Sequence, residues 1–174
     1  MRLSGSGGQG LILAGIILAE AAILDGKNAV QSQSYGPEAR GGSSKSEVLI
    51  SEQPIHYPKV VKPDLLLAMT QEALDKYAHD LPDDAMLVID TTFVKEIPEK
   101  FTRVYHLPIT EQAKEVLGKS LFANIIAIGA VVALTEAVST ESVTTAVLAR
   151  VPKGTEAKNK QALELGMALI QQKH

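Results

Sequence analysis

Two glycine-rich segments near the N-terminus contain the residues best suited to chemistry in this chain. They read Gly5-Ser6-Gly7-Gly8-Gln9-Gly10 and Ser34-Tyr35-Gly36-Pro37-Glu38-Ala39-Arg40-Gly41-Gly42. Glycine has no Cβ, so the first segment allows a backbone turn to approach a ligand closely. The second places one carboxylate and one guanidinium between turn-forming residues. Together they predict a shaped surface for an anionic ligand or a partner protein, but no complete catalytic apparatus.

The first segment matches the pattern G-x-G-x-x-G between a predicted strand and a predicted helix, as in dinucleotide-binding folds. The helix start offers free N–H groups and a partial positive charge to a phosphate. The acid that would bind an adenosine ribose is absent from the next predicted strand, residues 28–33, and Asp25 comes before that strand begins. Two interpretations stay open: a nucleotide-binding turn, or a tight turn that packs helix against sheet. The amide of Gln9 either serves a ligand or is a simple N-terminal helix residue.

The second segment places Glu38 and Arg40 between Gly36-Pro37 and Gly41-Gly42, which favours a loop shaped for contact. Arg40 could bind a carboxylate or phosphate through two parallel hydrogen bonds, and Glu38 could orient it or bind a partner. An exposed ion pair between the two is the alternative. The candidate site is completed by Ser34, Tyr35, Gly41 and Gly42.

Two further polar residues are supporting candidates. Asp90 ends a predicted apolar strand, at the edge where α/β folds place their ligands, and otherwise it caps the Thr91-Thr92 turn. Asn124 lies in an apolar helix and needs a hydrogen-bond partner if it is buried. We expect it to bind the backbone of a glycine loop, with a helix-pairing amide as the alternative.

Composition excludes several classes of function. The chain has no cysteine, which rules out a disulfide, a cysteine nucleophile and a thiolate-bound iron–sulfur cluster in this chain. Its histidines are too scattered for a metal-binding pair on one helix. A net charge of −3 and few aromatic residues argue against nucleic-acid binding. We therefore expect no catalytic residue, no metal site and no tightly bound cofactor here.

The apolar runs at 11–18 and 125–134 are shorter than the roughly 18–20 residues that cross a bilayer, so no membrane role is predicted. Arg2 and Ala19-Glu20-Ala21 resemble parts of a signal peptide, but glycines separate the charge from the apolar run, which continues past the supposed cleavage site. Both runs are interpreted as buried helices of a cytoplasmic protein.

The elements that must position these residues alternate between strand and helix. With 174 residues, 45% hydrophobic and only 4% aromatic, the chain is predicted to form one domain over residues 1–174, with an aliphatic core. The fold class is α/β, a three-layer Rossmann-like domain with a mostly parallel sheet and a helical C-terminal part. Strands are predicted at 1–4, 28–33, 46–50, 64–69, 86–90 and 104–108, and helices at 9–24, 71–79, 111–117, 121–135, 141–150 and 157–172.

The pairing of the two glycine-rich segments, in this order, resembles the γ subunit of the 2-oxoacid:ferredoxin oxidoreductases. The resemblance extends along nearly the whole chain, through the start of the strand at Pro63-Asp64, Asp90, Ala123-Asn124 and the closing helix from Asn159 to Gly166. The Pro-Glu-Ala-Arg-Gly-Gly form of the second segment is more similar to the 2-oxoglutarate branch than to the pyruvate or branched-chain branches.

The resemblance implies a subunit of an enzyme that decarboxylates a 2-oxoacid oxidatively, reduces ferredoxin and forms an acyl-coenzyme A. Thiamine diphosphate, Mg²⁺ and iron–sulfur clusters would belong to partner α and β subunits and, in complexes that contain one, to a δ subunit. The glycine turn and the Arg40 segment would face those subunits and help to form the coenzyme A approach. A homodimer is expected when the chain is isolated. The alternative is a stand-alone Rossmann-type nucleotide-binding domain or an NAD-dependent dehydrogenase.

Overall fold

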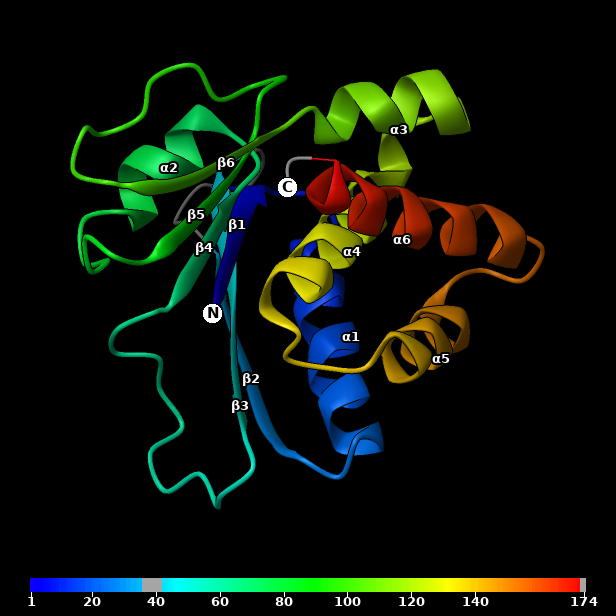
Figure 1. Cartoon of the computed structure of the whole chain (residues 1–174), viewed down its shortest axis with the longest axis horizontal. Helices are drawn as coiled ribbons and strands as arrows, with labels where there is room; N and C mark the ends of the chain where they lie inside the picture. Colours follow the sequence, from blue (N-terminus) through cyan, green and yellow to red (C-terminus); the bar gives the residue numbers. More distant parts are fainter. Residues whose placement is uncertain (36–41, 173–174) are drawn as a thin grey trace.

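The computed structural model describes residues 1–35 and 42–172 and confirms the predicted α/β fold (Figure 1). The strands are β1 (Arg2–Ser6), β2 (Asn28–Tyr35), β3 (Ser43–Ser51), β4 (Leu65–Ala68), β5 (Met86–Asp90) and β6 (Arg103–Leu107). The helices are α1 (Leu11–Leu24), α2 (Gln71–Tyr77), α3 (Ile109–Leu117), α4 (Ala123–Thr135), α5 (Thr140–Arg150) and α6 (Glu156–Gln171), and a 3₁₀ turn, Ser120–Phe122, precedes α4.

The six strands form one sheet in the order β2-β3-β1-β4-β5-β6. Strands β1, β4, β5 and β6 run parallel, whereas β3 is antiparallel to both β1 and β2. The predicted strands 28–33 and 46–50 were too short, because β2 and β3 continue as a regular hairpin that pairs Tyr35 with Ser44. The second glycine-rich segment therefore begins within β2 and ends at Gly42, directly before β3.

The side chains of the central strands point alternately into two hydrophobic clusters. Leu65 and Leu67 of β4 belong to the cluster that includes α1, α3, α4, α5 and α6. Leu66 and Ala68 belong to the other, which includes α2. Burial on both faces explains why β4 is apolar without alternation. Three layers result, with most helices on one side of the sheet (Figure 1).

Helices α4 and α6 cross closely because each has a glycine at the crossing. A Cβ added to Gly129 of α4 would collide with the Leu163 carbonyl oxygen of α6, and one added to Gly166 of α6 would collide with the Ile126 carbonyl oxygen of α4. This crossing fixes α4, whose first turn carries Asn124, within the helical layer.

A buried cation joins β1 to its neighbours. Arg2, 3% exposed, donates to the Glu47 carboxylate on β3 at 2.7 Å, to the Tyr77 carbonyl at 2.9 Å and to the Asp80 carboxylate at 2.5 Å. The hydrogen bond from Arg2 lowers the pKa of Asp80 below its ordinary value. These bonds hold β1, which leads into the glycine turn, against both β3 and the end of α2.

In the described part of the chain, every helix is too short or too polar to cross a bilayer. The same residues contain no group of three or more histidine or acidic side chains placed to hold a metal ion.

Candidate functional site

The first glycine-rich segment forms a turn at the carboxyl end of β1. Gly5 lies in β1 itself, where an added Cβ would collide with Gln9 Oε1 and lie 2.7 Å from Leu11 Cδ1. Gly8 and Gly10 have φ angles of +91° and +74°, which L side chains rarely adopt. The predicted helix start at residue 9 was two residues early, because Gly10 in the left-handed region is the N-cap of α1.

Two amide side chains brace this turn. Gln9 Oε1 accepts a hydrogen bond from the Ser6 backbone N–H at 2.7 Å, which closes the turn on itself. Asn124 Nδ2 donates to the Gly10 carbonyl at 3.4 Å, while its Oδ1 accepts from the Ile125 N–H at 2.9 Å. The predicted contact between Asn124 and the glycine loop is therefore present. The side-chain oxygen of Gln9 is thus used inside the turn.

A cavity of about 380 Å³ opens beside the turn, at the carboxyl edge of the parallel strands. It is lined by Gly8, Gln9, Gly10, Phe93, Thr110, Lys114, Ser120, Leu121, Ala123 and Asn124. The N-cap of α1, Gly10, and the first turn of α4 both line it, and the first turns of these two helices contain no acidic residue. Two helix N-termini and the Lys114 ammonium therefore make this cavity favourable for an anion.

Asp90 lies in the same region but serves the fold. It is fully buried; one carboxylate oxygen accepts from the Thr92 N–H at 3.1 Å, and the other accepts from the Thr110 N–H at 3.2 Å and the Thr110 hydroxyl at 2.5 Å. This matches the alternative interpretation of Asp90 as a cap of the turn that follows its strand. Asp90 holds the start of α3 against the end of β5, and thereby positions Thr110 at the cavity.

The second glycine-rich segment is only partly described. Ser34 and Tyr35 end β2, where Tyr35 is 67% exposed, and Gly36, Glu38, Arg40 and Gly41 lie outside the described residues. Gly42 accepts a hydrogen bond at its carbonyl oxygen from the Gly7 N–H at 3.0 Å. The structure thus joins the two glycine-rich segments, far apart in sequence, by a direct backbone contact.

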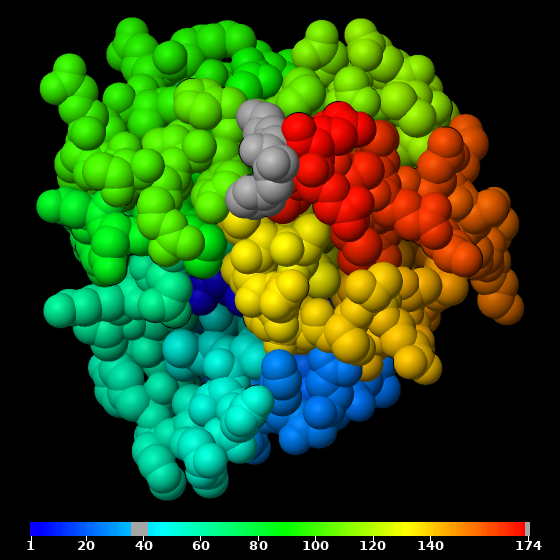
Figure 2. Space-filling model, in the orientation of Figure 1, coloured from blue at the N-terminus to red at the C-terminus, as the bar shows by residue number. Residues whose placement is uncertain are grey.

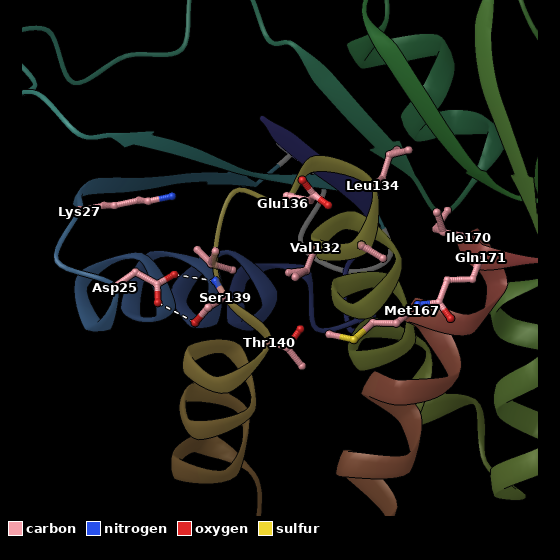
Figure 3. A pocket seen from close by; sticks show the side chains of 12 residues that line it. Asp25, Lys27, Val132, Leu134, Glu136, Ser139, Thr140, Met167, Ile170 and Gln171 are labelled. Carbon is pink, nitrogen blue, oxygen red and sulfur yellow. Dashed lines mark hydrogen bonds between the residues drawn. The ribbon is translucent and has the colours of Figure 1, made fainter. Parts of the chain in front are cut away.

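Other cavities are less suited to binding. One of about 860 Å³ lies near the C-terminal end of α1, where Asp25 points toward Ser139 (Figure 3). Asp25 accepts from the Ser139 N–H at 2.6 Å and from the Ser142 hydroxyl at 2.6 Å, and Lys27 donates to the Ala137 carbonyl. The hydrogen bond from Ser142 is the main cause of the lowered pKa of Asp25. These charged groups join α1 to α5 and its preceding loop.

A third cavity, of about 410 Å³, lies at the amino ends of the parallel strands, opposite the glycine turn. Met1, Val48 and Leu65 are in its lining. Figure 2 shows a recess in which the first residues of the chain, in dark blue, are visible between their neighbours. The glycine-turn cavity remains the best candidate, because it combines backbone N–H groups, helix N-termini and a cation.

Sequence reasoning missed several residues of this cavity: Phe93, Thr110, Lys114, Ser120 and Leu121. Thr110 could have been inferred, because it follows the end of β6 at the same sheet edge as Asp90. Lys114 lies one turn further along α3. Phe93 and Leu121 carry no local signal, since only the tertiary fold brings them to the glycine turn.

Comparisons with known proteins agree with this architecture. A family model described as "Pyruvate ferredoxin/flavodoxin oxidoreductase" matches residues 1–169. The 2-oxoglutarate synthase subunit KorC of Methanocaldococcus jannaschii is 51% identical over 169 residues, which cover 95% of this chain and 90% of that protein. The alternative of a stand-alone dinucleotide-binding domain or dehydrogenase is not supported.

Solved structures give the same result. The γ subunit of a keto/oxoacid ferredoxin oxidoreductase from Geobacter sulfurreducens superimposes with a TM-score of 0.87 at 50% identity, covering 98% of this chain and 97% of that one. A 2-oxoglutarate:ferredoxin oxidoreductase from Magnetococcus marinus shares the fold with a TM-score of 0.87 at 22% identity; the match covers 98% of this chain but 30% of that longer one. From its residues, its fold and these matches, the chain belongs to the pyruvate ferredoxin/flavodoxin oxidoreductase family.

Proposed function

We propose that this chain is the γ subunit of a cytoplasmic 2-oxoglutarate:ferredoxin oxidoreductase. The observation that carries the proposal is the match along nearly the whole chain to a protein named as a 2-oxoglutarate synthase subunit. The complex would decarboxylate 2-oxoglutarate, pass the two electrons to ferredoxin and transfer the succinyl group to coenzyme A.

The residues of this chain do not fit the redox cofactors of such a complex. The sequence contains no cysteine to ligate an iron–sulfur cluster, and no Gly-Asp-Gly segment followed by an asparagine that would hold the metal of thiamine diphosphate. We assign thiamine diphosphate, Mg²⁺ and the clusters to the α and β subunits and, in complexes that contain one, to a δ subunit. The γ subunit then contributes binding surface and geometry.

The rim of the glycine-turn cavity supports a subunit interface at this face. Phe93 and Leu121 both line the cavity, yet they are 45% and 61% exposed. Large apolar side chains gathered around a polar cavity are typical of a surface that a partner covers. We place an α or β subunit against this rim.

Coenzyme A brings phosphates, and 2-oxoglutarate brings carboxylates, so the approach to the active site must accommodate anions. The glycine turn, the start of α4 and Lys114 offer N–H groups and positive charge within one cavity. The contact between Gly7 and Gly42 ties the C-terminal end of the Arg40 segment to the glycine turn. We propose that Lys114 and Arg40 bind a phosphate or carboxylate of coenzyme A or substrate at the subunit boundary.

Affinity purification of the tagged chain from its native extract tests the assignment. We expect 2-oxoglutarate oxidoreductase subunits to copurify with the wild type, and much less of them with Leu121→Asp. Leu148→Asp, on α5 and 36% exposed, is the matched control and should retain the partners. Recovery of the wild type as a lone protein with bound NAD would overturn the proposal.

The anion-binding role is tested separately in the assembled enzyme. Arg40→Ala and Lys114→Gln should raise the KM for coenzyme A by roughly tenfold each, as expected for loss of a charge-assisted hydrogen bond. Lys160→Gln, on an exposed part of α6, should leave it unchanged. Unchanged coenzyme A kinetics in both Arg40→Ala and Lys114→Gln would refute this role without affecting the subunit assignment.

A further inference from the structure

The outer edge of the sheet beside β3 is formed by β2, which is long and regular. Its eight residues pair with β3 in continuous register from Asn28 opposite Ser51 to Tyr35 opposite Ser44, without a bulge. Among the described strands, none pairs with the other side of β2. That side presents a row of backbone N–H and C=O groups available to a further strand.

The two edges of the sheet differ in their protection against such pairing. Edge strands are usually shielded by charged residues, proline, bulges or short length. Strand β6, at the far edge, has five residues, includes Arg103 and His106, and is followed by Pro108. Strand β2 reads Asn-Ala-Val-Gln-Ser-Gln-Ser-Tyr, with no charge, no proline and no glycine. Within its eight residues, β2 therefore has none of the usual features that prevent strand addition, and its nearest proline, Pro37, comes after the strand has ended.

We propose that β2 pairs with β2 of a second copy of this chain, antiparallel, around a two-fold axis that passes beside Ser32. An uncharged strand does not repel its own copy, and a two-fold arrangement satisfies both free edges in one closed dimer. The two six-stranded sheets then become continuous.

The position of the axis decides which side chains of the two strands lie opposite each other. A two-fold axis perpendicular to the sheet keeps each face on its own side, so each residue lies opposite one on the same face. With Ser32 at the axis, Val30 lies opposite Ser34, and Ala29 lies opposite Tyr35. The Tyr35 ring, 67% exposed in the single chain, is thereby covered by the second copy.

Charge substitutions at Ser32 test the proposal by light scattering coupled to size exclusion on the full chain. The wild type should elute as a dimer at micromolar concentration. Ser32→Lys and Ser32→Glu should each be monomeric, because like charges would face each other with Cα atoms about 4.5–5.5 Å apart. An equimolar mixture of the two variants should restore the dimer. Thr102→Lys, which is exposed just before β6, is the control and should remain dimeric.

A monomeric wild type, dimeric Ser32 variants or a mixture that stays monomeric would each overturn the proposal. Backbone hydrogen exchange of the wild type gives an independent readout if a variant fails to fold. Dilution from dimer to monomer should accelerate exchange at the outward-facing N–H groups of β2 by at least about tenfold, with little change in β5. Equal exchange at both concentrations would contradict the inference, which does not depend on the proposed function.

Discussion

Alanine substitutions at Gly8 and Gly10 should separate two reasons why the turn requires glycine: a positive φ angle, and a lack of space for a Cβ atom. Both glycines have positive φ, but an added Cβ meets nothing within 4 Å at Gly8, whereas at Gly10 it would lie 2.5 Å from Asn124 Nδ2. Gly8→Ala therefore carries the cost of the left-handed conformation, about 1–2 kcal/mol, less a gain of about 0.4–1 kcal/mol from the stiffer unfolded chain.

Gly10→Ala adds a steric term to that conformational cost. The Asn124 side chain must move, which breaks its hydrogen bond to the Gly10 carbonyl and disturbs a residue that is 7% exposed. This term is about 1–2 kcal/mol, so Gly10→Ala should cost about 2–3 kcal/mol in total. Urea unfolding of the isolated chain, followed by circular dichroism, gives the free energy of unfolding.

A double-mutant cycle isolates the contact with Asn124. In the Asn124→Ala background, the nearest remaining atom is the Cβ of residue 124, at an ordinary contact distance of 3.5 Å. Gly10→Ala should then cost no more than Gly8→Ala, which gives an interaction energy of about 1–2 kcal/mol. Additive free energies, within about 0.5 kcal/mol, would refute the account of how Asn124 holds the turn.

Three further predictions concern the scaffold. Calorimetry should show that Gly166→Ala lowers the melting temperature by roughly 5–10 °C, because its Cβ would collide with the Ile126 carbonyl oxygen of α4. Gly7→Ala, whose added Cβ would lie 3.7 Å from the nearest atom and whose φ is not positive, should change the melting temperature much less. Asp90→Ala should cost about 2–4 kcal/mol in urea unfolding, since it leaves Thr110 donors buried without their acceptor; a loss below 1 kcal/mol would contradict this. The folded pKa of Asp80 is lower than its ordinary value of 3.8, so its stabilisation is present above about pH 4 and is lost as the pH falls through the folded pKa. Asp80→Asn should therefore destabilise the chain most at about pH 7 and progressively less as the pH falls below about 4, and an equal loss at every pH would contradict the role of Arg2.

Local patterns predicted the elements of the fold well. The unbroken apolar run at Leu65-Leu66-Leu67 is typical of a central strand, which β4 is, and Thr70, a residue type that favours N-caps, caps α2 by accepting from the Ala73 N–H. Ser139 likewise caps α5. Thr155 occupies the N-cap position of α6, but its hydroxyl donates to the Pro152 carbonyl and accepts no capping hydrogen bond from the helix backbone.

Errors arose where tertiary contacts decide local structure. Serine-rich residues 43–45 have weak strand propensity, yet they form β3 because β1 and β2 pair with them on both sides. The cavity beside the glycine turn assembles residues from three separate helices and loops, so Lys114 and Leu121 could not be foreseen from spacing. Asn124 was foreseen because a buried amide requires a partner.

We propose that this chain supplies an essential binding surface to an enzyme whose redox chemistry lies on other subunits. Reconstitution of the complex with and without the chain tests it most directly, with coenzyme A-dependent reduction of ferredoxin by 2-oxoglutarate as the readout. We predict that succinyl-coenzyme A formation requires the wild-type chain. Full succinyl-coenzyme A synthesis by the partner subunits alone would contradict the claim.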